Sequence, residues 1–218
     1  MATDEDLVSR FFTRADRHQA RVVGDLPADW WSRPYEYPWA ADLADPDGVV
    51  LDAGCGLGHP FKFLLADRCR EVHACDIDPA ITDGARVIAQ VTSWFGTDVA
   101  DAISSRYLAR VHWRQASVTD LPYAADFFDR IFCLSVLEHL AHLDVAAALR
   151  EFARSVRPTG LVVLTLDHPT LPPADLLGFV AAAGLAPAGP QHFDLPADAI
   201  HGYGLSCYRV VLKRAAVA

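Results

Sequence analysis

The chain has 218 residues, of which 52% are hydrophobic and 22% are charged, and a formal net charge of −9. A chain of this length can bury a substantial core, and its near-average composition excludes general disorder. The acidic balance argues against a nucleic-acid substrate, which requires basic patches, and no apolar run reaches the ~18 residues that span a bilayer.

The first 45 residues precede the predicted sheet. They begin with the acidic run Met1–Asp6, the opposite of the basic start of a secretory signal peptide. Five cysteines, an odd number, favour reduced and mostly buried thiols and therefore a cytoplasmic location. Residues 30–39 are rich in aromatic side chains, but Pro34 and Pro38 argue against a long regular helix there, so we predict a flap or turn.

Residues 49–58 are the most informative stretch of the chain. An apolar strand runs into Asp52 and then into a loop with glycine at every second position, Gly54, Gly56 and Gly58. A turn that leads directly from a strand into a helix needs glycine, because its backbone must adopt conformations that a Cβ disfavours and must approach a ligand closely. A dinucleotide fingerprint would place its third glycine at His59, so the spacing indicates a different nucleotide.

The next predicted strand, residues 71–76, ends in Asp76, which follows Gly54 by 76 − 54 = 22 residues. An acid about 20 residues after the first glycine, at the end of the second strand, is where such folds bind ribose hydroxyls. Enzymes that bind NAD place an acid similarly, so Asp76 alone does not select the cofactor. Ile77 would offer an apolar face to adenine, and Asp78 before Pro79 is typical of a helix N-cap.

The stretch from residue 78 to 108 exceeds one average helix and predicts an extra helix near residues 98–108. After it come SVTDLPY at residues 117–123, FFDRIFCLSVLEHL at 127–140, RSVRPTG at 154–160 and a strand at 161–166. With the glycine loop and Asp76, this order resembles the class I S-adenosylmethionine (SAM) dependent methyltransferases of the type 11 group, which read D-x-x-x-LPF, FD, VLEH and LKPGG. The resemblance covers residues 49–166, about half of the chain.

The resemblance implies an α/β fold, with a Rossmann-like, doubly wound sheet of seven strands in the order 3-2-1-4-5-7-6 and an antiparallel last strand. We expect one domain over residues 1–218. It comprises an N-terminal aromatic flap or helices (1–45), a SAM-binding core (48–166), and C-terminal strands with acceptor-side loops (167–218). Residues 174–183 predict a helix, and residues 208–212 the closing strand.

The resemblance also implies a set of cofactor-binding residues at the ends of the strands. They are Asp52, Gly54, Cys55, Gly56, Gly58, Asp76, Ile77, Ser117, Val118 and Leu134. The family commonly has an acid at the position of Ser117, where it holds the adenine amino group. A serine accepts a hydrogen bond more weakly, so we expect adenine recognition to depend on the backbone near Val118 and on apolar contact.

Two histidines are the candidate catalytic residues. His139 and His168 follow the fourth and fifth strands, whose carboxyl ends meet at one edge of the sheet, and a base is useful if the acceptor starts protonated. Each also has a structural interpretation: His139 in holding the loop or the cofactor's methionine end, and His168 in shaping a turn before Pro169. The spacing of His139 and His142 also permits a metal site with Glu138 and His168, but the motifs account for the site without one, so we predict no metal.

The aromatic stretch keeps two interpretations. It folds over the mouth of the sheet, with Tyr35, Tyr37 or Trp39 lining an acceptor pocket and Arg33 meeting a carboxylate, or it only covers the sheet's apolar surface. Because no cap domain is inserted in the core, this segment and the loops of residues 167–205 are the remaining material for an acceptor site.

These observations predict a SAM-dependent methyltransferase (EC 2.1.1.-) that modifies an O or N atom of a small molecule. We expect no nucleic-acid or membrane partner, and a monomer or homodimer in the cytoplasm. The alternative keeps the fold but makes SAM structural or regulatory, or uses it in a reaction other than methylation. An NAD-binding oxidoreductase is disfavoured by the glycine spacing and by residues 157–160, and the identity of the acceptor is not encoded in any recognisable motif.

Overall fold

The computed structural model describes residues 5–216. The acidic start, from which we expected no signal peptide, includes residues 1–4, which lie outside the described residues. No helix in the described range is both long and apolar enough to cross a bilayer.

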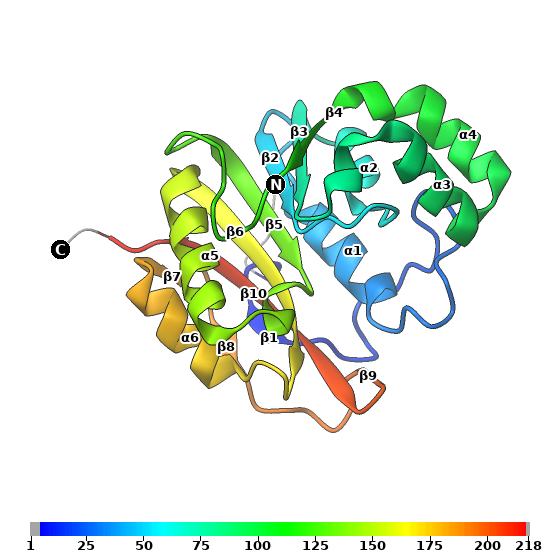
Figure 1. The fold of residues 1–218 in the computed structure, drawn as a ribbon. Coiled ribbons are helices and arrows are strands. Elements are labelled where there is room, and N and C mark those ends of the chain that lie inside the picture. The colour runs from blue at the N-terminus through cyan, green and yellow to red at the C-terminus, as the bar shows by residue number, and fades with distance from the viewer. Residues whose placement is uncertain (1–4, 217–218) are drawn as a thin grey trace.

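The fold is built on one mixed sheet that runs through the molecule (Figure 1). Five parallel strands lie side by side in the order β4-β3-β2-β5-β6, and the antiparallel strand β10 follows β6. Their bounds are β2 Val49–Ala53, β3 Glu71–Asp76, β4 Val111–Gln115, β5 Phe128–Leu134, β6 Val156–His168 and β10 Leu205–Arg214. This part of the sheet confirms the predicted order 3-2-1-4-5-7 and the antiparallel last strand.

The outer edge of β10 corrects the prediction of seven strands, because residues 5–216 form a sheet of ten. Several short strands stand where one sixth strand was expected. Three of them pair with β10: β1 Ser9–Phe11, β7 Leu185–Pro187 and β9 His201–Gly202. The fourth, β8 Gln191–His192, pairs with β1. Pro187 ends β7 and Pro190 precedes β8, and because proline cannot donate to a ladder, both strands stay short. We expected the N-terminal segment only to precede the sheet, but it contributes the strand β1 to the sheet's edge.

Helices cover both faces of the sheet (Figure 1). One face carries α1 Arg33–Asp42, α2 Phe61–Ala66, α3 Gly84–Phe95 and α4 Thr97–Arg106, and the other carries α5 His142–Ser155 and α6 Pro173–Ala182. Three short 3-10 helices complete the set: η1 Pro79–Thr82, η2 Leu108–Arg110 and η3 Leu137–His139. Alternate residues of β2 enter two cores, Val50 toward α1 to α4, and Leu51 toward α5 and α6. Helices α4 and α6 confirm the helices predicted near 98–108 and 174–183.

Helix α1 corrects the prediction of a flap or turn, because it is a regular helix of ten residues despite its two prolines. Pro34 lies in the first turn, where no intrahelical donor is needed. Pro38 cannot donate to the carbonyl of Pro34, and that carbonyl instead accepts a hydrogen bond from the amide of Gln19 at 2.8 Å. The loop before the helix thus supplies the hydrogen bond that the carbonyl of Pro34 cannot receive from Pro38.

Asp78 caps a helix as predicted, but the helix is the single turn η1. Its carboxylate accepts a hydrogen bond from the amide of Ala80 at 2.8 Å. Helix α3 starts separately, at Asp83, whose carboxylate accepts from the amides of Ala85 and Arg86.

Phe12 tests whether the N-terminal segment belongs to the core. Its ring is fully buried, lies edge-on to Trp39 with centroids 5.6 Å apart, and faces the Arg209 guanidinium at 5.5 Å. We expect Phe12→Ala to lower the free energy of unfolding by about 3–5 kcal/mol, measured by urea denaturation. Leu195→Ala, at a side chain that is 49% exposed, is the matched control and should change it by less than about 0.5 kcal/mol. Equal effects of the two substitutions would contradict this assignment.

Candidate functional site

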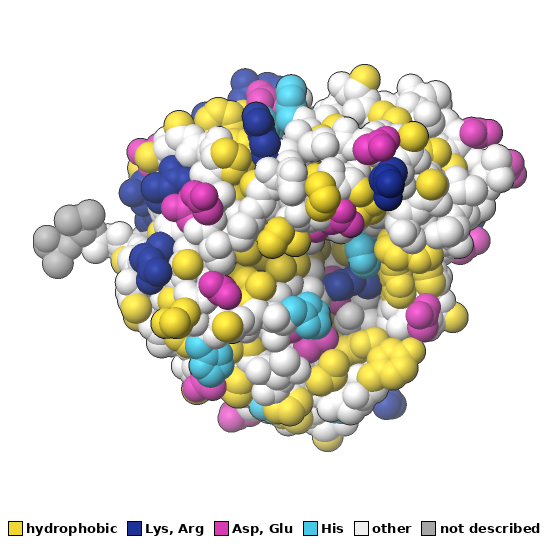
Figure 2. Space-filling model, in the orientation of Figure 1, with side chains coloured by type: hydrophobic (Ala, Val, Ile, Leu, Met, Phe, Trp, Pro, Cys, Tyr) yellow, Lys and Arg dark blue, Asp and Glu magenta, His cyan; other side chains and the backbone are white. Residues whose placement is uncertain are grey.

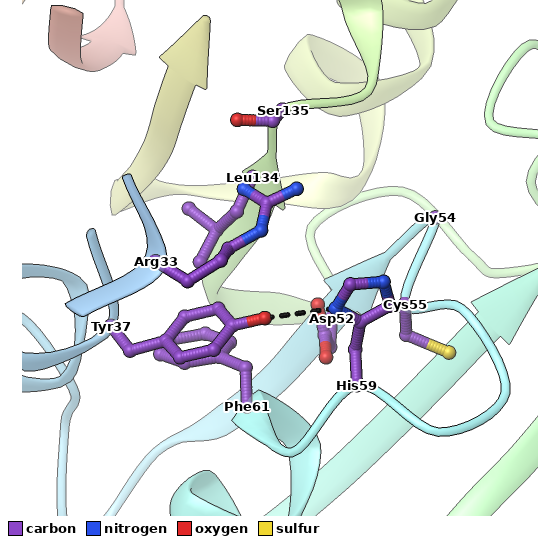
Figure 3. Close-up of a pocket in the computed structure, with 9 residues that line it drawn as sticks. All are labelled: Arg33, Tyr37, Asp52, Gly54, Cys55, His59, Phe61, Leu134 and Ser135. Atoms are coloured by element: carbon purple, nitrogen blue, oxygen red, sulfur yellow. Dashed lines mark hydrogen bonds between the residues drawn. The ribbon is translucent and has the colours of Figure 1, made fainter. Parts of the chain in front are cut away.

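Two adjoining cavities open where the carboxyl ends of β2, β5 and β6 meet α1. The space-filling view shows a hollow near the centre of this face, with histidine, basic and acidic side chains on its walls (Figure 2). The inner cavity is lined by Arg33, Tyr37, Asp52, Gly54, Cys55, His59, Phe61, Leu134 and Ser135 (Figure 3). The outer cavity shares Arg33, His59 and Ser135 with it and adds Asp29, Trp30, Trp31, Ser32, His139, Asp167 and Tyr203.

Lys62, from α2, holds the glycine loop that forms the floor of the inner cavity. Its buried ammonium group donates hydrogen bonds to the carbonyls of Cys55 at 3.1 Å, Gly56 at 2.6 Å and His59 at 2.6 Å. Gly56 has a φ of +55°, and a Cβ built on it would lie 2.6 Å from the His59 ring. Glycine is therefore required here both by the backbone conformation and by the close approach of His59.

Asp76 joins the loop after β2 to the loop after β3. One carboxylate oxygen accepts a hydrogen bond from the amide of Gly56 at 2.8 Å, and the other accepts from the amide of Asp78 at 3.0 Å. A carboxylate has about four lone-pair sites, so each oxygen can still accept from a ligand hydroxyl. The side chain is only half-buried, which leaves it accessible from the glycine loop.

Asp52 places a buried carboxylate in the inner cavity. Its Oδ2 atom has no hydrogen-bond partner among the described residues. Burial raises the pKa of Asp52 to about 7, although the Lys62 ammonium opposes the shift. A cationic group entering the cavity would stabilise the ionised form and satisfy the unpaired oxygen.

Arg33 and Glu36, both from α1, connect this helix to the ends of β5 and β6. Arg33 lines the inner cavity together with Leu134 (Figure 3), and its guanidinium pairs with the fully buried carboxylate of Glu36 at 2.6 Å. The same carboxylate oxygen accepts hydrogen bonds from Ser135 at 3.1 Å and from Thr165. The network fixes α1 against the strands, so that Arg33 borders both cavities.

His59 stands between the two cavities. Its Nδ1 atom is 3.0 Å from the hydroxyl of Tyr37, and its ring stacks on Trp30, with centroids 4.4 Å apart and planes inclined by 21°. The edge of the ring also meets Trp94 at 5.2 Å. Burial lowers the pKa of His59 to about 3, so the imidazole is neutral at physiological pH.

Asp167 faces the outer cavity, whereas the predicted His168 does not line either cavity. Successive residues of a strand point to opposite faces, and the His168 ring packs edge-on against Phe11, with centroids 5.7 Å apart. The Oδ1 atom of Asp167 is buried without a partner among the described residues. Burial and the nearby Glu36 charge raise the pKa of Asp167 to about 6. His139, also predicted, is exposed and lines the outer cavity.

The structure gathers some of the other predicted site residues and separates others. Arg33, Tyr37, Asp52, Gly54, Cys55 and Leu134 line the inner cavity, while Gly56, Gly58 and Asp76 shape the glycine loop. Five other predicted residues line neither cavity: Tyr35, Trp39, Ile77, Ser117 and Val118. Of these, Ile77 has a side chain that is 72% exposed. Tyr35 and Trp39 line a separate cavity beside Arg10 and Asp16, and the Ser117 hydroxyl lies 2.7 Å from that of Thr119.

Several site residues were missed by the sequence analysis: Trp30, Trp31, Glu36, His59, Lys62, Asp167 and Tyr203. Asp167 had a usable signal, because an acid at the carboxyl end of a parallel strand points to a site. Tyr203 lies between two glycines at the tip of the β9–β10 hairpin, with a φ of +53°. No sequence pattern marked Lys62, whose role arises only from the path of the loop.

A family model described as a methyltransferase domain matches residues 51–164. A ubiquinone biosynthesis O-methyltransferase from Xanthomonas campestris is 32% identical over 160 residues, which are 71% of this chain and 58% of that protein. The chain spans only 36% and 58% of the length of the first two curated relatives that it matches.

Solved structures share the fold at low identity. A TehB-like SAM-dependent methyltransferase from Corynebacterium glutamicum has a TM-score of 0.58 at 17% identity, covering 82% of this chain and 86% of that one. The cyclase SpnF has a TM-score of 0.62 at 14% identity, covering 94% and 89% of the two chains.

Glu138, in η3 beside the outer cavity, tests the electrostatics of this region. Both of its carboxylate oxygens are buried without partners among the described residues, and burial, with the charges of Asp167 and Glu36, raises its pKa to about 8. Between the unfolded value of about 4.3 and this pKa, the folded state holds a proton that the unfolded state releases. Rising pH therefore destabilises the parent through this group.

We accordingly expect the free energy of unfolding of Glu138→Gln to exceed that of the parent by an amount that grows from about pH 5 to about pH 8 and then levels off. Urea denaturation of both proteins at a series of pH values measures this difference. A difference that stays constant across the series would contradict the shift.

Proposed function

Since the chain belongs to the methyltransferase domain family, we propose that it transfers the methyl group of SAM to an oxygen or nitrogen atom of a small molecule. The observation that carries this proposal is the excess of buried carboxylates around the two cavities. Asp52, Glu36 and Asp167 each keep a buried oxygen without a partner among the described residues. SAM carries an ammonium and a sulfonium group, so its charge complements these acids.

The residues at the floor of the inner cavity fit SAM. Asp52 would accept hydrogen bonds from the amino group, and Asp76 from the ribose hydroxyls. The loop from Gly54 to Gly58 would allow close approach of the methionine portion to the backbone. When bound, SAM supplies an activated methyl group whose leaving group is a neutral thioether.

The volumes of the cavities set a condition on binding. The inner cavity measures about 70 Å³ and the outer about 190 Å³, whereas pockets for drug-sized ligands measure roughly 300–1,000 Å³. His59 and Trp30 border the outer cavity, stack on each other and are only partly buried. We therefore propose that both rings move aside when the site fills.

The outer cavity is our proposed acceptor site. Trp30, Trp31 and Tyr203 give it flat apolar walls, which suit a small molecule with a ring or another planar group. We propose Asp167 as the general base, because its carboxylate borders the cavity and is ionised above a pKa of about 6. His139 remains the alternative base, and the curated relatives named O-methyltransferase favour an oxygen acceptor.

The cellular location and the assembly of the enzyme complete the proposal. The five cysteines are buried and without disulfides, which suits a reducing compartment, and we propose a cytoplasmic location. We expect the protein to act as a monomer or a homodimer, with the small-molecule acceptor as its binding partner. A role for SAM outside methylation stays the alternative, since the fold is shared with a protein named as a cyclase.

A direct test measures the product. The protein is incubated with SAM and a panel of phenols, carboxylic acids and amines, and S-adenosylhomocysteine is quantified by mass spectrometry. Formation of this product in step with a methylated acceptor supports the proposal. SAM binding with no such product from any acceptor would favour the alternative role for SAM.

Asp76→Ala tests the cofactor site. By titration calorimetry the parent should bind SAM and S-adenosylhomocysteine, and not NAD. The substitution should weaken both ligands by a similar factor, at least about tenfold, since a charged hydrogen-bonding partner contributes on the order of 1.5–3 kcal/mol. Asp78→Ala, at the neighbouring exposed acid, is the control and should change neither affinity. Unchanged affinities in Asp76→Ala would remove this residue from the site.

Asp167→Asn tests the base. We expect it to lower the turnover number at least about a hundredfold with SAM affinity retained, because proton transfer by a positioned base contributes that much or more. The parent's rate should fall below about pH 6 as the carboxylate takes up a proton, and the variant should lose this acid limb. His168→Asn, one residue along the strand and facing away from the cavity, should keep the parent's profile. If Asp167→Asn retains the acid limb and His139→Asn loses it, His139 is the base instead.

A further inference from the structure

Three side chains with metal-ligand chemistry gather away from both cavities, on strands β3 and β4. Glu71 and His73 lie two residues apart in β3, and therefore project from the same face of the sheet. His112 in β4 is the register partner of His73. These two strands are parallel neighbours, and β4 is the edge of the sheet, so the three side chains meet at its margin.

The ligand atoms are close enough to share one ion. The His73 Nε2 atom lies 2.7 Å from the Glu71 Oε1 atom, and the rings of His73 and His112 lie face to face with centroids 4.7 Å apart. One ligand atom from each of the three residues lies within 4.8 Å of the other two. Ligands about 2.0–2.2 Å from an ion are at most roughly 4.4 Å apart, so a small rotation of the exposed His112 completes the arrangement.

The surroundings prepare these groups for binding. His73 is 12% exposed and is held edge-on by the rings of Tyr123, Phe127 and Phe128. The His73 Nε2 atom is directed at the Glu71 carboxylate, and metals bind the neutral form of imidazole and the ionised form of a carboxylate.

We propose that Glu71, His73 and His112 bind one divalent transition-metal ion such as Zn²⁺. Two imidazoles and a carboxylate suit Zn²⁺, Co²⁺ or Ni²⁺, whereas Mg²⁺ and Ca²⁺ prefer sites made of oxygen ligands alone. Water fills the remaining positions. The ion takes the place of the hydrogen between His73 Nε2 and Glu71 Oε1, and the ring proton of His73 moves to Nδ1.

The position of the site indicates a structural role, independent of the proposed methyl transfer. An edge strand is held on one side only, and a metal bridge would add a link between β4 and β3. The chain leaves β4 at Gln115 and continues to Ser117 and Val118. Arg114, whose positive charge acts on His73, opposes a cation and limits the affinity.

Titration calorimetry of the tag-free protein with Zn²⁺ tests the proposal, with Mg²⁺ as the contrasting ion. We expect one Zn²⁺ per chain, a higher melting temperature with Zn²⁺ present, and no binding of Mg²⁺. His112→Asn changes an exposed side chain, and Glu71→Gln keeps the side-chain volume, so both variants should fold. Removing a residue that is only hydrogen-bonded to a metal ligand weakens metal binding roughly 10- to 100-fold. Each of these substitutions removes a ligand itself and should therefore weaken Zn²⁺ binding by more than that.

His192→Asn, at an exposed histidine of β8, is the matched control and should bind Zn²⁺ as the parent does. Circular dichroism checks that every variant is folded. If the parent does not bind Zn²⁺, or if His112→Asn and Glu71→Gln bind it as tightly as the parent, the proposal is overturned. An equal loss in His192→Asn would mark nonspecific binding by surface histidines and would overturn it as well.

Discussion

The buried ammonium group of Lys62 is the interaction on which the candidate site depends. Burying a charge costs free energy unless the charge is fully hydrogen-bonded, and three loop carbonyls accept its three protons. Those bonds turn the carbonyls of Cys55, Gly56 and His59 toward α2. The loop amide of Gly56 is then directed to Asp76, and the His59 ring is placed between the cavities. An arginine is a poor substitute, because its planar donors do not match three convergent carbonyls.

Helix α1 is the second constraint, because it brings residues from the start of the chain against strands that lie a hundred residues later. One side chain, Glu36, accepts hydrogen bonds from both Ser135 after β5 and Thr165 in β6. A fully buried carboxylate in such a network is costly to leave unpaired, so the position of α1 is sharply defined. The wall that α1 forms is consequently tied to the sheet by buried hydrogen bonds, although the segment contains two prolines and no cofactor motif.

The sequence predicts the central part of this fold well, because there the determinants are local. Gly54 and Gly56 specify a turn by their positive φ, and Asp76 ends a strand whose position follows from the turn. The residues that line the acceptor site depend instead on which face of a strand or helix each side chain occupies. Residues 167 and 168 differ by one position in a strand, which decides the face on which each side chain lies. In α1 the same holds for Tyr37, which enters the cavity, and Trp39, which does not. No local pattern fixes that face, and the pairing of β1 with β10 joins residues about two hundred positions apart.

The stack of Trp30, His59 and Trp94 has an optical consequence. Indole emission depends on the polarity around the ring, and Trp30 is held between the His59 ring and the edge of Trp94. Of the five tryptophans, Trp39 is buried and Trp113 donates a hydrogen bond to the carbonyl of Leu108, and neither lines the two cavities. Any molecule that separates Trp30 from His59 changes the environment of Trp30 and of Trp94, which meets both rings, and an occupant of the outer cavity also meets Trp31. The protein therefore carries its own fluorescent reporter of occupancy, and no label is needed to follow how fast its site fills and empties.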